Sequence, residues 1–128
     1  MSSTNRADDD SVSLTVPARP EYLRLVRLAA ADAGARAELS IEEIDDLRIA
    51  VDELSYALLG DDPLDETLTL RYVASVGVVE IEGACPAPDE PVEVSQLSKS
   101  IIGAVVDEHE IFERVGLRRF TLVKRGRT

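Results

Sequence analysis

Residues 47–59, which read LRIAVDELSYALL, constrain the fold of this chain more than any other stretch. Apolar residues recur there at the spacing of a helix with one buried face. Ser40 and Glu43 form a capping-box pattern, which satisfies free backbone N–H groups and so fixes the start of the helix. Gly60 marks its end. One carboxylate, Glu53, interrupts the largely apolar run, and the stretch therefore predicts a core helix that carries one candidate functional group.

The remaining acids of this helix fall on the side away from its apolar stripe. The stripe consists of Ile44, Leu47, Val51, Leu54 and Leu58. The acids are Glu42, Asp45, Asp46 and Asp52. We expect these acids to form a solvated face rather than a site.

Alternation, helical spacing and turn residues predict the other elements. The predicted strands are residues 11–16, 67–75, 78–83 and 118–124, with a tight turn at Gly77 and a proline-rich loop at 84–91. A first helix runs from Pro20 to Gly34, and a third has the apolar stripe Val94, Leu97, Ile101 and Val105. This order indicates an α+β fold, a two-layer α/β sandwich in which about three helices cover one face of a mostly antiparallel mixed sheet.

Composition narrows the function classes. A chain of 128 residues that is 45% hydrophobic is long enough for one domain, which we place at 11–128 after a disordered tail at 1–10. Its formal net charge of -11 makes direct contact with nucleic acid or an anionic membrane unfavourable. The single cysteine, Cys85, cannot form an internal disulfide, and no apolar run approaches the length of a membrane span. We therefore expect a cytoplasmic protein.

The succession of SVSLTVPARPEYLRLVRLAA, IEEIDDLRIAVDEL, a strand hairpin and a terminal FTLVKR resembles the bacterial anti-sigma regulatory factors. The resemblance covers roughly residues 11–125. Members of that family are small serine kinases with the histidine-kinase-like (Bergerat, GHKL) ATPase fold. The resemblance implies that Glu53 occupies the position of a general base, which removes a proton from an attacking hydroxyl or water. It also implies a magnesium-binding asparagine four residues later and an adenine-binding aspartate at a strand end.

Glu53 matches that pattern, but the sequence departs from it at the magnesium, adenine and phosphate positions. Ala57 stands where the family has its magnesium ligand, and a methyl group has no lone pair to offer the ion. Glu82 falls at the adenine position, followed by a single glycine and then Pro86. The phosphate-covering segment, PDEPVEVSQLS, lacks glycine and carries Glu93 and other acids. We therefore expect ATP or ADP binding with magnesium, and kinase activity, to be lost; Glu53 is then vestigial. We expect no bound metal.

The resemblance also implies a strand at 106–112 and a partner-binding surface on the first helix. Arg24 and Arg27 project together there and are the candidate partner-binding residues, with solvated helix charges as the alternative. We take Arg118, Arg119, Lys124 and Arg125 as charges that protect an exposed final strand from indiscriminate pairing. We assign no site role to His109, the only histidine.

Three functions stay open at this point. The first is an anti-sigma factor or partner-switching regulator that binds a sigma factor and a STAS-type anti-sigma-factor antagonist without catalysis; the acidic charge suits a basic partner surface. The second is an active serine kinase that phosphorylates the antagonist, with Glu53 as base. The third is an inactive decoy for the antagonist. The resemblance further implies a homodimer.

Overall fold

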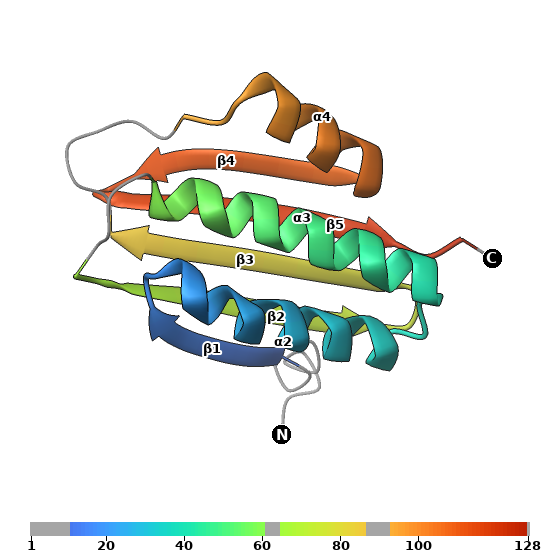
Figure 1. Ribbon diagram of the computed structural model, residues 1–128. Helices are drawn as coiled ribbons and strands as arrows, with labels where there is room; N and C mark the ends of the chain where they lie inside the picture. Colours follow the sequence, from blue (N-terminus) through green and yellow to red (C-terminus); the bar gives the residue numbers. More distant parts are fainter. Residues whose placement is uncertain (1–10, 61–64, 87–92, 128) are drawn as a thin grey trace.

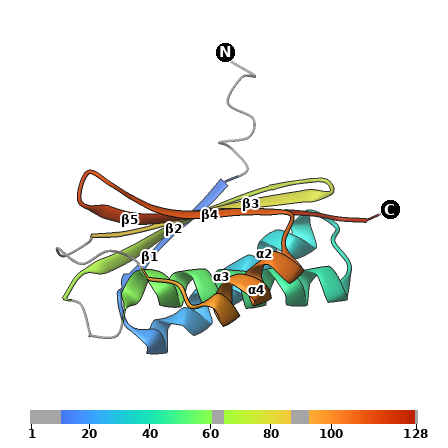
Figure 2. The ribbon, with the colours of Figure 1, turned by 90° about the horizontal axis from the view of Figure 1, so that it is seen from above.

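Two layers make up the computed structural model, which describes residues 11–60, 65–86 and 93–127. One layer is a five-stranded sheet in the order β1-β2-β3-β5-β4 (Figure 1). The helices all lie on one face of it (Figure 2). The strands are β1 (Ser11–Pro17), β2 (Thr67–Ser75), β3 (Val78–Pro86), β4 (Glu108–Arg114) and β5 (Leu117–Arg125). The helices are a short 3-10 turn, η2 (Pro20–Tyr22), and α2 (Leu23–Arg36), α3 (Ile41–Leu59) and α4 (Gln96–Val105).

The predicted fold class is confirmed. Each pair of neighbouring strands in the described chain is antiparallel, and three α-helices cover one face. The capping box is present: the Ser40 side chain accepts from the Glu43 backbone N–H, and the Glu43 carboxylate accepts from the Ser40 N–H. None of the helices in this part of the chain has the length and apolar character needed to cross a membrane.

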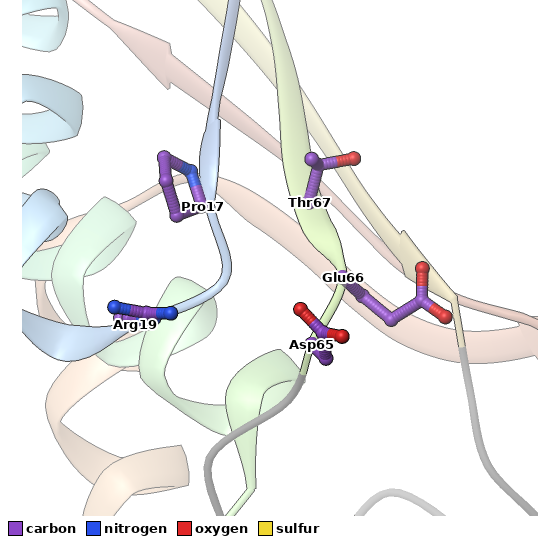
Figure 3. A pocket seen from close by; sticks show the side chains of 5 residues that line it. All are labelled: Pro17, Arg19, Asp65, Glu66 and Thr67. Carbon is purple, nitrogen blue, oxygen red and sulfur yellow. The ribbon is translucent and has the colours of Figure 1, made fainter.

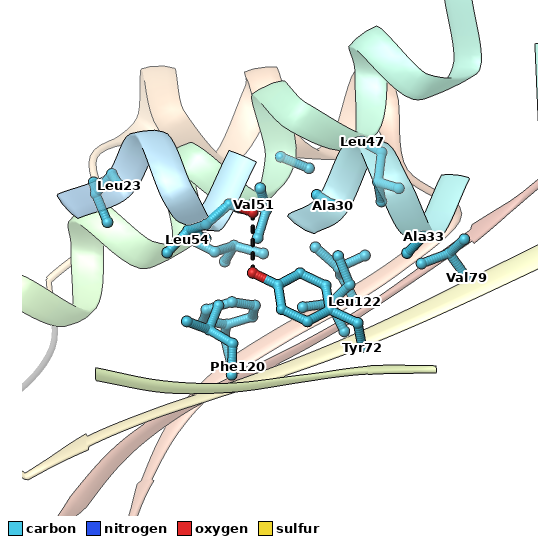
Figure 4. Close-up of a cluster of buried hydrophobic side chains, with 14 of the residues drawn as sticks. Leu23, Ala30, Ala33, Leu47, Val51, Leu54, Tyr72, Val79, Phe120 and Leu122 are labelled. Carbon is cyan, nitrogen blue, oxygen red and sulfur yellow. Dashed lines mark hydrogen bonds between the residues drawn. The ribbon is translucent and has the colours of Figure 1, made fainter. Parts of the chain in front are cut away.

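The core lies between the sheet and the helices (Figure 4). Leu47, Val51 and Leu54 of α3 are fully buried there, as the apolar stripe predicts. Tyr72 of β2 is also fully buried, and its hydroxyl donates to the Val26 carbonyl of α2 over 3.0 Å. Burial raises the pKa of this phenol far above its ordinary value, so Tyr72 serves as a neutral hydrogen-bond donor that ties α2 to the sheet.

The first helix does not stop at Gly34. It continues to Arg36, and Gly34 is buried where α2 meets α3. A Cβ atom added there would lie 2.8 Å from Cγ1 of Ile44. Gly34 therefore allows the two helices to approach closely, which local sequence does not distinguish from a helix stop.

Two other boundaries differ from the prediction. β3 extends through Cys85 to Pro86, because these residues pair with Arg118 and Leu117 of β5 and strand pairing overrides the local loop signal. In α4 the fully buried residue is Ile102, whereas Leu97 of the predicted stripe is 72% exposed. A helix that contacts the core along a narrow strip buries few of its apolar residues.

The final strand is not at the edge of the sheet. β5 lies between β3 and β4, so β1 and β4 form the two edges (Figure 1). Arg118 and Lys124 are accordingly buried on the helix-facing side rather than exposed as edge charges. The edge prediction was wrong because the last strand in sequence inserts beside β3, which only strand pairing decides. The predicted tail, at 1–10, lies outside the described residues, as do most of the acids of the phosphate-covering segment.

Candidate functional site

The predicted functional residue, Glu53, lies where α3 and α4 pack together over β5. We call this place the α3–α4 seam. It comprises Asp46, Glu53 and Ala57 on α3, Ser98 and Val105 on α4, and Lys124 on β5. Asp46, Glu53 and Ala57 share one side of α3 because they are seven and four residues apart. The seam therefore places the candidate general base directly against the third helix.

Glu53 holds a hydroxyl group of its own chain. Ser98 Oγ donates to Glu53 Oε1 over 2.8 Å, and both side chains are partly buried. Ser98 is itself fixed by the N-terminus of α4, where its backbone N–H donates to Oγ of the capping residue Ser95 over 3.0 Å. A hydrogen bond to a charged acceptor is about twice as strong as one between neutral groups. The contact therefore anchors the first turn of α4 to α3.

Lys124 anchors the other end of α4. Its Nζ donates to the Val105 carbonyl over 2.7 Å and to Oδ2 of Asp46 over 3.2 Å. The Lys124 side chain is only 8% exposed and the Asp46 side chain is 38% exposed, so the ion pair is shielded from water on the lysine side. Asp46 is thus partly exposed, and it is also paired with a lysine of the sheet, which the sequence did not predict. With Ile102 buried between the two anchors, α4 is fixed along its length.

The described residues of the seam do not fit a magnesium ion. Ala57 provides no oxygen, Asp46 is paired with Lys124, and Glu53 accepts from Ser98. Within the described chain, no three His, Cys, Asp or Glu side chains are grouped so that they could hold a metal. Magnesium requires several oxygen ligands in near-octahedral geometry. What the seam can do is hold one hydroxyl against one carboxylate.

Glu82 and Glu53 are not brought together. Glu82 is exposed on β3, whereas its neighbours Ile81 and Gly83 are buried toward the helices, so Glu82 points away from the helix layer. There it faces Arg71 of β2, with Nη1 to Oε2 at 3.4 Å. The sheet lies between the two glutamates, so one nucleotide could not contact both. The adenine position implied by the resemblance therefore falls on the solvated face.

Gly83, the single glycine after Glu82, serves core packing. It lies directly opposite Phe120 of β5, and an added Cβ would come within 2.3 Å of the Phe120 ring. The ring fills the space above Gly83 and is fully buried. The Phe120 ring, rather than the approach of a ligand, explains why this position is a glycine.

The two candidate partner-binding arginines are in different situations. Arg24 is exposed on α2. Arg27 donates to Oδ1 of Asp52 on α3 over 2.6 Å, with both side chains between one third and two fifths exposed. The Arg27–Asp52 ion pair therefore connects α2 and α3. The expectation of a solvated acidic face did not include this contact of Asp52. Arg24 is therefore the better candidate for contact with a partner, because Arg27 is already engaged with Asp52.

A shallow hollow of about 330 Å³ lies elsewhere, beside the start of β2 (Figure 3). Pro17, Arg19, Asp65, Glu66 and Thr67 line it. None of the sequence-predicted site residues reaches it. It is open to solvent, and its opposite charges indicate no particular ligand.

Two contacts of the seam were not predicted: that of Ser98 with Glu53, and those of Lys124 with Asp46 and Val105. Lys124 alternates with Phe120 and Leu122 on the buried face of β5, and a lysine in such a row signals a partner in the opposite layer. Ser98 follows Ser95 by three residues, the spacing of a helix cap to the N–H that it satisfies. That spacing predicts the helix start, but the contact with Glu53 depends on how α4 docks.

Comparison with known proteins identifies relatives of this chain. No protein-family model matches the chain. It is 36% identical over 77 residues to a serine-protein kinase RsbW of Listeria monocytogenes. The aligned residues cover 56% of this chain and 48% of that protein. A serine-protein kinase RsbW of Bacillus pumilus is 32% identical over 77 residues, again 48% of its length. The chain thus spans about half the length of the curated relatives it matches.

The fold has a solved counterpart. A structure of the RsbU and RsbW domains of Rv1364c from Mycobacterium tuberculosis matches with a TM-score of 0.70 and 19% identity. The match covers 90% of this chain and 32% of that one. At that identity the match supports the fold alone, and the sequence matches support the relationship. Together they confirm the resemblance that the sequence indicated.

Proposed function

We propose that this chain, a relative of the RsbW serine-protein kinases, is an anti-sigma or partner-switching regulator that acts by binding proteins. In this proposal it binds a sigma factor and a STAS-type antagonist and transfers no phosphoryl group. One observation carries the proposal: Glu53 is retained but held by Ser98, while Ala57 removes the oxygen that would anchor magnesium.

Loss of nucleotide binding is tested with the intact chain. We expect millimolar Mg-ATP or Mg-ADP to leave the melting temperature unchanged, because a ligand stabilises a protein only when it binds the folded state. Restoring the oxygen with Ala57→Asn is the informative variant. A Mg-ATP-dependent rise in the wild-type melting temperature would contradict the proposed loss.

The second candidate is the active serine kinase, and one observation favours it. Glu53 stands where the resemblance implies the general base, and both it and Ser98 are only partly buried, so a substrate hydroxyl could replace Ser98 at this carboxylate. The test is transfer of labelled phosphate from ATP to the antagonist, with Glu53→Gln as the matched control. Transfer that disappears in Glu53→Gln would establish the kinase and refute the binding-only proposal.

For the partner surface we propose Arg24 and its surroundings on α2. Arg24 is exposed, whereas Arg27 is engaged with Asp52, so Arg24→Glu changes the surface without breaking a contact between helices. We expect Arg24→Glu to weaken capture of the sigma factor, and Arg114→Glu, an exposed arginine on β4, to leave it unchanged. Equal capture by both variants would reject this surface. Capture of the antagonist alone would favour the decoy.

Two further properties belong to the proposal. We propose that the protein works in the cytoplasm. The free, buried Cys85 supports this location, because it forms no disulfide within the chain. We also propose that it forms homodimers, as the resemblance implies.

A further inference from the structure

We propose that the outer side of the α3–α4 seam is a docking surface for a partner helix whose apolar face carries one arginine or lysine that pairs with Glu53. The inference rests on the proposed function, because it assigns a second surface to a protein that acts by binding proteins. Two observations carry it. Hydrophobic side chains surround Glu53 on the solvent side of the helices, and the Glu53 carboxylate has no cationic partner in the described chain.

Two exposed hydrophobic residues of α3 flank Glu53. Ile49 lies four residues before Glu53 and Tyr56 lies three residues after it, so both share its side of the helix. Ile49 is 43% exposed and Tyr56 is 54% exposed. These two side chains are therefore available for contact on either side of the carboxylate.

The facing helix, α4, supplies two more. Ile101 lies three residues after Ser98 and four after Leu97, so the three residues share one side of α4. Leu97 is 72% exposed and Ile101 is partly exposed. We call Ile49, Tyr56, Leu97 and Ile101 the seam rim.

Two contacts fix the register of the helices. Ser98 donates to Glu53. Seven residues further along α4, the Val105 carbonyl shares the Lys124 ammonium with Asp46. Asp46 precedes Glu53 by seven residues, so α3 and α4 are antiparallel, as Figure 1 shows.

This register gathers the seam rim around one place. Each residue advances a helix by about 1.5 Å, so Ile101 lies level with Ile49, and Leu97 lies level with the turn that carries Tyr56. Hydrophobic residues scattered singly over a surface are ordinary, whereas a contiguous exposed group marks an interaction site. The seam rim is such a group, with Glu53 at its centre.

The charge at this centre is not balanced within the described residues. Three neighbouring acids of α3 each have a basic partner: Asp45 with Arg48, Asp46 with Lys124, and Asp52 with Arg27. Glu53 has only the neutral hydroxyl of Ser98. Hydrogen bonds between charged groups are about twice as strong as those between neutral groups. An arginine or lysine therefore complements Glu53 better than the hydroxyl does.

The arrangement of the seam rim favours a helix as the occupant. Its four side chains form two short rows on antiparallel helices, and an amphipathic helix lays its apolar face along such rows with anchors three or four residues apart. A cation among those anchors then reaches Glu53. The formal net charge of -11 also favours a basic partner, since complementary charge speeds association and specifies the partner.

The first test uses two synthetic peptides that differ at one position. Each is an alanine-rich, helix-forming peptide of about 20 residues with leucines along one face. The central residue of that face is arginine in one peptide and glutamine in the other. We expect fluorescence anisotropy to show binding of the arginine peptide to the intact chain, about fivefold tighter than that of the glutamine peptide.

The second test changes the protein. Glu53→Gln keeps an oxygen that can accept from Ser98 but removes the charge, so we expect it to abolish the difference between the two peptides. Leu97→Ser should weaken binding of both peptides. The matched control is Leu28→Ser, because Leu28 is 64% exposed on α2, and this variant should bind like the wild type. Circular dichroism and thermal melting verify that the variants are folded.

Each outcome decides the inference. Binding selective for arginine that Glu53→Gln makes unselective and Leu97→Ser weakens would establish the surface. It would be overturned if neither peptide bound at millimolar concentration, if both bound equally, or if the two variants bound like the wild type. Those failures would leave the proposed function standing, because that function is read from capture of the sigma factor and the antagonist. Failure of the wild type to capture either protein would overturn the proposed function, whatever the peptides do.

Discussion

Gly83 shows how the absence of one side chain determines the packing between two strands. The Phe120 ring occupies the space in which a Cβ of residue 83 would lie, at 2.3 Å from the nearest ring carbon. Real Cβ atoms do not approach other atoms so closely, so either the ring or the strand must shift when a methyl group is added. The aromatic ring in turn covers the glycine and restores the buried contact that the missing side chain would make.

We therefore expect Gly83→Ala to destabilise the protein by about 1–3 kcal/mol through overpacking, measured by urea unfolding. The matched control is Gly103→Ala in α4, where an added Cβ meets no atom within 4 Å. That substitution should raise the unfolding free energy by about 0.5–1 kcal/mol, because alanine favours the helix over glycine. A second change, Phe120→Leu, should reduce the cost of Gly83→Ala. Equal effects of the two alanine substitutions would refute the packing role.

At the scale of elements, β5 supplies the cations that the helices lack at their C-termini. Neither α3 nor α4 has a basic residue in its last turn. Arg118 Nη1 donates to the Leu58 carbonyl near the end of α3 over 3.0 Å, and Lys124 Nζ donates to the Val105 carbonyl at the end of α4. Both contacts satisfy carbonyl groups that a helix leaves free and place a positive charge at the negative end of its dipole.

Removing the buried cation tests this arrangement. Lys124→Met keeps much of the side-chain volume but leaves Asp46 without its partner and the Val105 carbonyl without its donor. We expect a loss of about 2–3 kcal/mol in the free energy of unfolding. Lys99→Met on the exposed surface of α4 is the matched control and should leave the unfolding midpoint unchanged. An unchanged midpoint for Lys124→Met would show that this ion pair does not hold the helices.

The start of α3 depends on pH through Glu43. The Glu43 carboxylate accepts from the backbone N–H of Ser40 and also from that of Arg127, which follows β5. These bonds, that of Ser40 first, lower the pKa of Glu43 below its ordinary value of 4.5. A carboxyl group with a depressed folded-state pKa contributes its full stability above the unfolded pKa, and the contribution is lost as the pH falls through the folded pKa.

We accordingly expect the stability of the wild type to fall as the pH drops below about 4.5, and Glu43→Gln to weaken this dependence. The measurement is urea unfolding from neutral pH into the acid range. Glu42→Gln removes a carboxylate from the same helical turn and leaves the capping box intact, so it is the matched control. If both variants respond to acid equally, the capping box is not the source of the dependence.

At the scale of the whole molecule, acidic charge outweighs the ion pairs that neutralise it. The chain has 25 Asp and Glu against 14 Lys and Arg, and several of the basic residues are committed to partners within the fold. Excess charge of one sign opposes the compact state by self-repulsion, and dissolved salt screens it.

We expect the melting temperature to rise as sodium chloride increases from low to physiological concentration, at fixed protein concentration and pH 7. Screening of exposed ion pairs acts in the opposite direction but is small for each pair. The control is sucrose at matched osmolality, which stabilises without screening charge. A melting temperature that falls with salt would indicate that the ion pairs outweigh the self-repulsion.

Several features of this protein follow from local physics. Residues 40–60 specify a helix because the Ser40–Glu43 cap, the apolar period and Gly60 all agree, and the structure has α3 at Ile41–Leu59. The alternation in 11–16, 67–75 and 118–124 likewise predicts strands that the structure contains. The two-layer class follows from their order, and the sequence has Ala57 at the position where the resemblance implies a magnesium ligand. Periodicity and caps act between residues close in the chain, so a sequence displays them directly.

Contacts between elements distant in the chain are decided by the tertiary structure. The insertion of β5 between β3 and β4 turns Arg118 and Lys124 from expected edge charges into buried caps. The docking of α4 places Ser98 against Glu53, and the sheet separates Glu53 from Glu82. In each case the residue type is compatible with more than one partner, because burial and hydrogen bonding depend on which surfaces meet. The sequence therefore determined which helices and strands form, and the packing of the layers decided what Glu53 touches.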